Sequence, residues 1–233
     1  MIRIFAVIGI LGMLTLSAAA QPKLAVPSNR FDFGYVPQNS TVTHYFWFKS
    51  IGADTARITD IKTGCDCTTI PLERDWVAPG DSMRVGVYWD TERKVGNSGR
   101  YPYIYVKGQQ EAERLFLTAE VTLFPDSVRP VSLKPYKAEL SKMASLSVDS
   151  VTVTLTNHSD RMIGLTRVSA PMNEYLVRMP DSIQPGSTGA VTIVVAPEFA
   201  GSEFSRSLTI AYDGGVPNLA GRFTIPIRRK IIS

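Results

Sequence analysis

Residue types and motifs that carry most enzyme chemistry are scarce in this sequence. Its 233 residues include only two cysteines and two histidines. Phosphate-binding loops, dinucleotide fingerprints, His-Glu-x-x-His metal motifs and Gly-x-Ser-x-Gly nucleophile elbows are all absent from it. Gly96-Asn97-Ser98-Gly99 lies between predicted strands rather than before a helix, so it is a turn and not a phosphate cradle. We therefore predict that the protein is not an enzyme.

Neither basic nor acidic residues are in large excess. The 25 basic and 21 acidic residues give a formal net charge of +4. The one basic cluster is Arg228-Arg229-Lys230, and we expect it to be a solvated tail. Because the basic residues are not interleaved with surface aromatics, the sequence predicts no nucleic-acid partner.

Long apolar runs are missing except near the N-terminus. Arg3 precedes an apolar run over residues 4–16, and Ala18-Ala19-Ala20 follows it. This order is typical of a secretion signal cleaved before Gln21, and the run is too short for a comfortable membrane span. We expect a signal peptide at residues 1–20, no membrane span after cleavage, and a periplasmic or secreted protein. An uncleaved anchor is the alternative.

Helical periodicity is rare, whereas short runs of alternating apolar and polar residues are frequent. Residues 42–48 form such a run, and Pro, Gly, Asn and Asp separate it from the next. Many short strands with turns every few residues are typical of β-sandwiches. Further strands are expected over residues 83–89, 101–106, 115–123, 151–155, 162–168, 190–195, 207–212 and 222–227.

The second half of the chain repeats the pattern of the first. Asp54 and Pro79 are 25 positions apart, as are Asp160 and Pro185, and each Pro precedes a Gly. Two copies of one unit explain this spacing. We predict an all-β protein with two tandem immunoglobulin-like β-sandwich domains after the signal peptide. The expected domains are residues 21–125 and 126–233, with the boundary near residues 125–130.

Four motifs in the first half carry a family resemblance. They are Phe31-Asp32-Phe33-Gly34, a strand with His44, Phe46 and Phe48, then Cys65-Asp66-Cys67-Thr68, and Pro79-Gly80. In this order they resemble a family of bacterial envelope domains known only as a domain of unknown function (number fifteen seventy-three). That family is similar to the immunoglobulin-like domains of major sperm protein and hydin-type ciliary proteins.

The resemblance covers about residues 31–108 and implies a Gram-negative envelope location. Asp66 stands where the family has Gly. If that position needs a positive φ, Asp66 is strained there.

The two cysteines, Cys65 and Cys67, allow three interpretations. A local disulfide suits an exported protein, but two residues of extended strand rise about 6.6 Å, too far for an unstrained bridge. A metal site is the second, with Cys65, Cys67 and His44 as ligands for Cu or Zn. The third is two small residues packed at a strand edge. His44 shares a face with Phe46 and Phe48, so we also expect it to be a core or half-buried histidine.

The leading functional prediction is a non-enzymatic immunoglobulin-like module for protein–protein interaction or envelope structure. Its partner is an unknown envelope protein. Tyr45 and Trp47 point away from the core face of their strand, and we expect them to be buried as a second layer. The rival is metal or thiol-redox handling through Cys65, Cys67 and His44. A weaker alternative is carbohydrate binding by the aromatic residues Trp76, Trp89, Tyr101, Tyr103 and Tyr105.

Triplets of Asp, then Ser or Thr, then an apolar residue occur five times, whereas composition alone predicts roughly one. Turn chemistry before a strand produces such triplets. They also resemble the acceptor sites of a general O-glycosylation system in some Gram-negative envelopes. The candidate acceptors are Thr55, Ser82, Ser127, Ser150 and Ser182.

Overall fold

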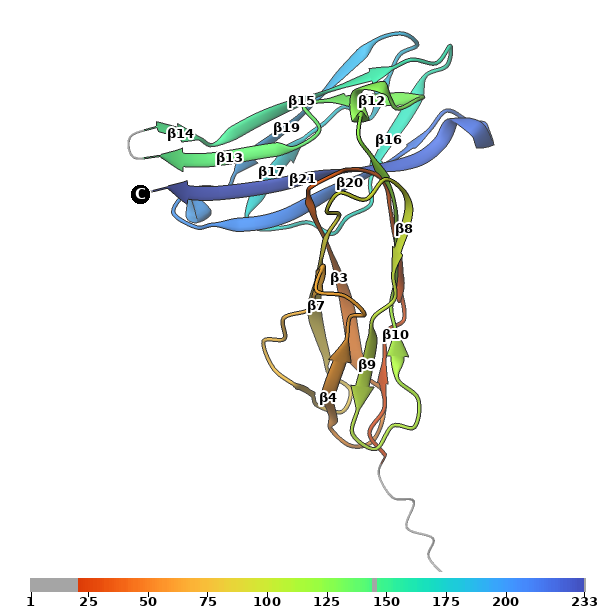
Figure 1. Ribbon diagram of the computed structural model, residues 1–233, viewed down its shortest axis with the longest axis vertical. Helices are drawn as coiled ribbons and strands as arrows, with labels where there is room; N and C mark the ends of the chain where they lie inside the picture. Colours follow the sequence, from red (N-terminus) through yellow and green to blue (C-terminus); the bar gives the residue numbers. More distant parts are fainter. Residues whose placement is uncertain (1–20, 144–145, 233) are drawn as a thin grey trace, which may run out of the picture.

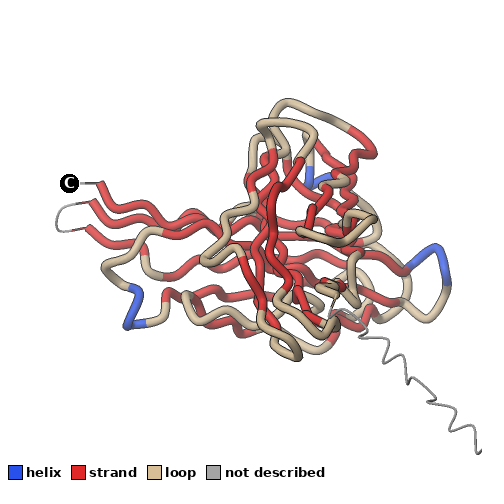
Figure 2. The backbone as a smooth tube through the Cα atoms, turned by 90° about the horizontal axis from the view of Figure 1, so that it is seen from below, coloured by secondary structure: helices blue, strands red, loops and turns tan. Residues whose placement is uncertain are grey.

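The computed structural model of the protein describes residues 21–143 and 146–232. The predicted signal peptide, residues 1–20, lies outside the described part. In that part, regular structure is strand throughout except for three short 3-10 turns (Figure 2). No helix there is long and apolar enough to cross a membrane. The prediction of an all-β fold is confirmed.

The N-terminal unit consists of β1 to β11. It contains a sheet in the order β1-β3-β7-β5 and a second in the order β10-β9-β4-β6. Its strands are β1 (Leu24–Ala25), β2 (Arg30–Pro37), β3 (Thr41–Ser50), β4 (Ala56–Lys62), β5 (Thr68–Thr69), β6 (Trp76–Val77), β7 (Ser82–Asp90), β8 (Gly96–Arg100), β9 (Tyr103–Val106), β10 (Glu113–Arg114) and β11 (Phe116–Thr122).

The C-terminal unit consists of β12 to β21 and lies across the upper end of the N-terminal unit in Figure 1. It contains a sheet in the order β12-β15-β19-β17. Its elements are η1 (Pro125–Ser127), β12 (Val131–Lys134), β13 (Ala138–Met143), β14 (Leu146–Val148), β15 (Ser150–Asn157), β16 (Ile163–Arg167), β17 (Tyr175–Arg178), β18 (Ser182–Ile183), β19 (Thr188–Val195), η2 (Pro197–Phe199), β20 (Phe204–Asp213), η3 (Pro217–Leu219) and β21 (Ala220–Ile232).

Each unit has its own hydrophobic core. The buried side chains of one core run from Leu24 to Val121, and those of the other from Val131 to Ile227. Strand alternation places them: β3 buries Phe46 and Phe48 but exposes the residue between them. The two units are therefore open β-sandwiches of the immunoglobulin-like kind. Whether each unit folds alone stays a prediction.

A nine-stranded sheet joins the two units, because β2 pairs in parallel with β21. Gly34 makes this approach possible, with φ +64° and a position where a Cβ atom would lie 2.1 Å from the Arg222 carbonyl oxygen. The Thr224 hydroxyl donates to the Phe33 carbonyl at 2.6 Å, and the Thr43 N–H donates to the Ser207 hydroxyl at 2.8 Å. The glycine of the Phe-Asp-Phe-Gly motif thus serves close backbone packing.

The basic cluster at residues 228–230 is not a solvated tail, so that prediction was wrong. It belongs to β21, where Arg229 is only 1% exposed. The Arg229 guanidinium forms an ion pair with Asp149 at 2.8 Å and donates to the Ala200 carbonyl at 2.6 Å. Pairing of β21 with β13 and β20 places this residue between two strands.

Candidate functional site

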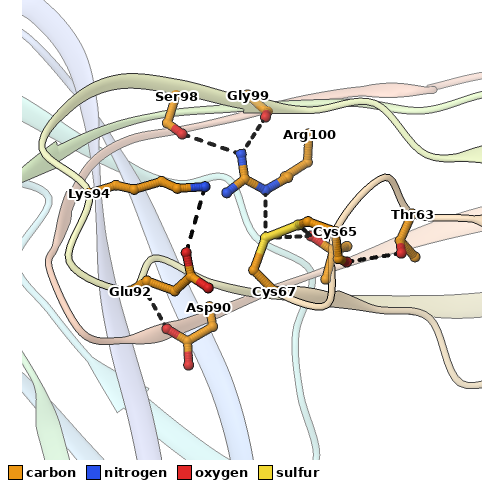
Figure 3. Close-up of a disulfide and its surroundings, with 10 residues drawn as sticks. Thr63, Cys65, Cys67, Asp90, Glu92, Lys94, Ser98, Gly99 and Arg100 are labelled. Carbon is orange, nitrogen blue, oxygen red and sulfur yellow. Dashed lines mark hydrogen bonds and ion pairs between the residues drawn. A yellow bond between two sulfur atoms is a disulfide. The ribbon is translucent and has the colours of Figure 1, made fainter.

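Cys65 and Cys67 form a disulfide in the turn between β4 and β5, with Cα atoms 5.2 Å apart (Figure 3). The chain is not extended here, because Gly64 adopts a φ of +82° and starts a tight turn. The sequence-based objection to a local bridge assumed an extended strand and does not apply to this turn. Asp66 is not among the residues with positive φ, so its difference from the family's Gly causes no strain.

The backbone of the cysteine loop is held by three hydrogen bonds. The Thr68 N–H and the Thr63 hydroxyl both donate to the Cys65 carbonyl, at 3.3 and 3.0 Å. The Asp90 N–H donates to the Cys67 carbonyl at 2.8 Å. Since Asp90 ends β7, this last hydrogen bond fixes the loop to an inner strand of the β1-β3-β7-β5 sheet.

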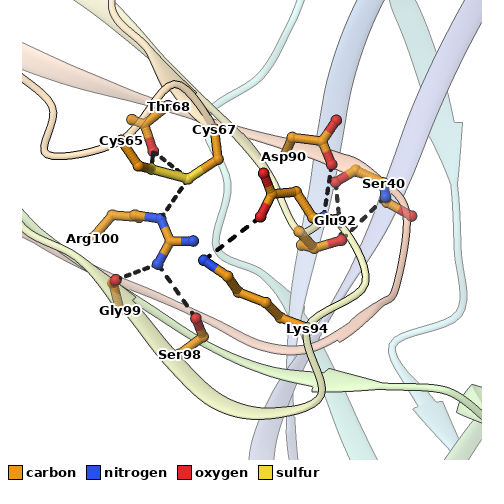
Figure 4. A network of polar contacts seen from close by, with 11 residues as sticks. Ser40, Cys65, Cys67, Thr68, Asp90, Glu92, Lys94, Ser98, Gly99 and Arg100 are labelled. Carbon is orange, nitrogen blue, oxygen red and sulfur yellow. Dashed lines mark hydrogen bonds and ion pairs between the residues drawn. A yellow bond between two sulfur atoms is a disulfide. The ribbon is translucent and has the colours of Figure 1, made fainter.

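Arg100, at the end of β8, packs directly against the disulfide. Its Nε donates to the Cys67 Sγ at 3.0 Å and its Nη1 to the Gly99 carbonyl at 2.6 Å (Figure 4). The guanidinium also lies over the Trp89 ring, 4.7 Å from its centroid. Arg100 is 9% exposed, and burial lowers the pKa of its guanidinium. The site is thus a disulfide that accepts a charge-assisted hydrogen bond from a buried cation.

The charge of Arg100 has no carboxylate ion-pair partner among the residues that the structure describes. Glu92 acts on its pKa in the direction opposite to burial, but the carboxylate pairs with Lys94 at 3.6 Å. The Arg100 Nη2 is buried and lacks a hydrogen-bond partner there. Leaving such a donor unsatisfied is costly, and a buried group of this kind calls for a specific explanation.

His44 lies on β3 and packs as an aromatic residue. Its ring stacks on Phe31 with centroids 3.6 Å apart and meets the edge of Phe46 at 4.7 Å. Burial lowers the pKa of His44 to about 4, with a smaller contribution from Arg222. The expectation of a core or half-buried histidine is confirmed.

The structure pairs the cysteines with each other and packs His44 against phenylalanines. Among residues 21–143 and 146–232, no cluster of three or more His, Cys, Asp or Glu is arranged to hold a metal ion. A Cu or Zn site at Cys65, Cys67 and His44 stays a prediction, and it concerns the reduced protein, because metals bind thiolates.

Trp47 is 57% exposed, so the expectation that both faces of β3 are buried was wrong. Tyr45, on the same face, is half-buried because Arg84 lies over its ring, 4.2 Å from the centroid. Gly86 on β7 leaves room for that ring, since a Cβ atom there would lie 2.9 Å from it. The outer face of β3 and β7 therefore carries accessible aromatic and cationic side chains.

This face borders a groove of about 540 Å³ where the two units meet. We call it the junction groove and define it by Tyr45, Trp47, Arg84, Glu174 and Arg206. Arg206 of β20 pairs with Glu174, its Nε lying 2.9 Å from the Glu174 Oε1. Residues of both units thus line one surface.

The Tyr45 hydroxyl lies 3.2 Å from that of Tyr88, and Arg206 Nη1 donates to the Tyr88 hydroxyl at 3.1 Å. Burial and this hydroxyl contact raise the pKa of Tyr45, so its phenol is neutral at ordinary pH. The groove therefore offers neutral aromatic rings beside the Arg84 charge.

Four of the five aromatic residues proposed for carbohydrate binding are exposed, namely Trp76, Tyr101, Tyr103 and Tyr105, and carbohydrate binding by them stays a prediction. Trp89 is fully buried, so its inclusion was wrong. Tyr103 and Tyr105 of β9 are partly exposed, at 37% and 36%. Each lies beneath a cation, Arg114 for Tyr103 and Lys62 for Tyr105.

None of the five candidate glycosylation residues is buried. Two of the triplets show turn chemistry: the Asp54 carboxylate accepts the Thr55 N–H at 2.6 Å, and that of Asp81 accepts the Ser82 N–H at 2.7 Å. Modification stays a prediction for all five. They are Thr55 and Ser182, half-buried, and Ser82, Ser127 and Ser150, exposed.

Sequence reasoning missed the two arginines that define these surfaces. Arg100 follows Cys67 by 33 residues, and Arg206 lies in the other unit, 118 residues from its partner Tyr88. Neither belongs to a motif. No local signal in the sequence identifies them, because strand pairing alone brings them into place.

Residues 24–121 match the family described as "Protein of unknown function (DUF1573)". The match covers the N-terminal unit, and the resemblance inferred from its motifs is confirmed. A search of curated proteins finds no match to the chain.

Several solved structures are weakly similar to this chain. A protein of unknown function from Porphyromonas gingivalis W83 is 10% identical, covers 88% of this chain and 99% of its own, and has a TM-score of 0.34. SSP-19, an MSP-domain protein like family member from Caenorhabditis elegans, is 20% identical over 42% of this chain and 97% of its own, with a TM-score of 0.33. WR4, another C. elegans MSP family member, is 17% identical over 44% and 97%, with a TM-score of 0.32. Similarity at this level carries no argument about function.

Proposed function

We propose that the protein is an exported, non-enzymatic immunoglobulin-like module of the bacterial envelope that binds a segment of another protein in the junction groove. The observation that supports this most is Trp47, a large aromatic side chain more than half exposed on a strand whose other face is core. Protein interfaces are enriched in Trp, Tyr and Arg, and a few such residues carry most of the binding energy. The groove presents all three types.

The chemistry of the groove specifies the kind of partner. Arg206 is neutralised by Glu174, and Arg74, which also borders the groove, is neutralised by Asp81. Arg84 instead stacks on Tyr45 and forms no carboxylate ion pair among the described residues. A partner with an apolar anchor for Trp47 and a carboxylate for Arg84 complements this surface. Export rests on the signal-like composition of residues 1–20 and periplasmic or secreted location follows from it.

The experiment compares Trp47→Ala with Met162→Ala. Met162 is a matched control because it is also an apolar side chain that is more than half exposed, at 54%. It precedes β16, which pairs with β20 at Asp213, the opposite end of that strand from Arg206. Both proteins, and the unaltered one, are immobilised and exposed to extract from the producing envelope, and bound proteins are quantified by mass spectrometry. We expect a partner that Met162→Ala retains and Trp47→Ala loses, with a dissociation constant raised at least tenfold, about 1.4 kcal/mol.

Unfolding midpoints verify that both variants remain folded, since exposed side chains contribute little to stability. The same partners at the same amounts on all three proteins would refute binding at the groove.

A further inference from the structure

We propose that the Cys65–Cys67 disulfide undergoes thiol–disulfide exchange with a dithiol substrate. Cys65 is the sulfur attacked, Cys67 is the thiolate released, and Arg100 stabilises that thiolate. This redox exchange goes beyond the non-enzymatic binding role proposed above and is independent of it, because it involves none of the groove residues.

The two sulfurs lie in different surroundings. Cys67 is 9% exposed and belongs to the core cluster, with Arg100 against its sulfur. Cys65 is half-buried, between the exposed residues Gly64 and Asp66. Exchange requires access to the sulfur under attack. An incoming thiolate therefore approaches Cys65 from solvent, whereas the core blocks approach to Cys67.

The reaction balances with a dithiol as the reductant. A substrate thiolate attacks the Cys65 Sγ, the Cys65–Cys67 bond breaks, and its electron pair stays on the Cys67 Sγ as a thiolate. The substrate's second thiolate then attacks its own sulfur in the mixed disulfide and releases Cys65. The substrate dithiol is oxidised to a disulfide, the protein is reduced to two thiols, and the two substrate protons pass to the protein thiols or to solvent.

Arg100 is suited to the released charge. Its Nε already lies 3.0 Å from the Cys67 Sγ, and its buried Nη2 has no partner within the described residues. A cation this close lowers a thiol pKa by about 1–3, and a leaving thiolate of lower pKa departs faster. The Thr68 hydroxyl, 3.8 Å from each sulfur, is a second donor.

The other charged groups around the loop have mixed signs. Asp66 between the cysteines and Asp90 on β7 carry negative charges, which disfavour a nearby thiolate. The opposite charges of Glu92 and Lys94 offset each other, because the two side chains form an ion pair. Arg100 is the one cation among them that donates a hydrogen bond to a sulfur. The small size of the ring also favours reduction. Closing a three-residue loop removes little entropy from the unfolded chain, so losing the disulfide costs the fold little stability.

The first test measures the equilibrium between the protein and glutathione redox buffers, with the products quenched in acid and separated by mass. Arg100→Gln keeps much of the side-chain length without the charge, and Arg57→Gln is the control, because Arg57 is an exposed arginine of the same unit. We expect Arg100→Gln to favour the disulfide about tenfold or more relative to the unaltered protein, and Arg57→Gln to leave the equilibrium unchanged. Equal equilibria for Arg100→Gln and the unaltered protein would overturn the role of Arg100.

The second test locates the charge directly. Cys65→Ser leaves Cys67 as the only thiol, and its thiolate is titrated by ultraviolet absorbance. We expect the apparent pKa of the Cys67 thiol to lie below the usual value of about 8.5. Adding Arg100→Gln should raise this pKa by about one pH unit or more. An unchanged pKa in the double variant would contradict the proposed stabilisation, and circular dichroism shows whether each variant is folded.

The third test needs no substitution. The unaltered protein is treated with limiting glutathione, the mixed disulfide is trapped with an alkylating agent, and peptide fragmentation locates the adduct. We expect glutathione on Cys65 and the alkyl group on Cys67. The reverse arrangement, or no mixed disulfide at all, would overturn the proposal.

Discussion

His44 makes the stability of this protein depend on pH in a window that can be calculated. Its ring stacks on Phe31 and meets the edge of Phe46 inside the N-terminal unit. Burial, aided by the charge of Arg222, lowers its pKa from 6.5 to about 4. The folded protein therefore binds a proton at His44 less readily than the unfolded chain does.

The sign follows from this difference. Because the pKa of His44 is lower in the folded state, its full contribution to stability is present at pH values above 6.5, the value for the unfolded chain. This contribution is lost as the pH falls towards 4. Each pKa unit corresponds to about 1.4 kcal/mol. We expect the free energy of unfolding to fall by about 2 kcal/mol between pH 7 and pH 5, and by about 3 kcal/mol by pH 4, through His44 alone.

Urea unfolding followed by tryptophan fluorescence at several pH values measures this loss. His44→Gln replaces the titrating ring with a neutral side chain, so its stability should decline less on acidification by about the amounts given above. His158→Gln is the matched control, because the other histidine is exposed in a turn, beside the Ser132 hydroxyl at 2.7 Å. Parallel losses in the unaltered protein and His44→Gln would refute the reasoning.

Two further predictions concern the junction and the surface. Gly34→Ala should destabilise the protein by more than about 2 kcal/mol, since its Cβ would overlap the Arg222 carbonyl. Gly64→Ala, with positive φ but nothing within 4 Å, isolates the backbone strain, and an equal loss of unfolding free energy in both variants would contradict the clash. If the Asp-Ser and Asp-Thr triplets are glycosylated, protein purified from its own envelope should exceed the mass of the chain from Gln21 by whole glycans, and a mass equal to the bare chain removes that hypothesis.

Local patterns in the sequence were enough to predict much of the architecture. Alternation over residues 42–48 predicted a strand with Phe46 and Phe48 in the core, because successive side chains point to opposite faces. Pro79-Gly80 and Pro185-Gly186 predicted turns, and both glycines adopt positive φ, at +76° and +61°. Such features depend on neighbouring residues only, so they can be predicted from the sequence without knowledge of the tertiary structure.

Local patterns thus predicted most strands, several turns and the family resemblance of the N-terminal unit. The prediction of a turn at residues 96–99 was wrong, because these residues belong to strand β8 and pair with β11. Which surfaces are free and which groups meet depends on tertiary contacts. Alternation gives two faces to β3 but does not say whether a second layer covers Trp47, and it is exposed. Arg229 reads as part of a basic tail until β13 and β20 flank it. Arg100 reaches Cys67 because the fold brings the end of β8 against the cysteine loop. These outcomes depend on contacts between residues far apart in the chain, which no local pattern encodes.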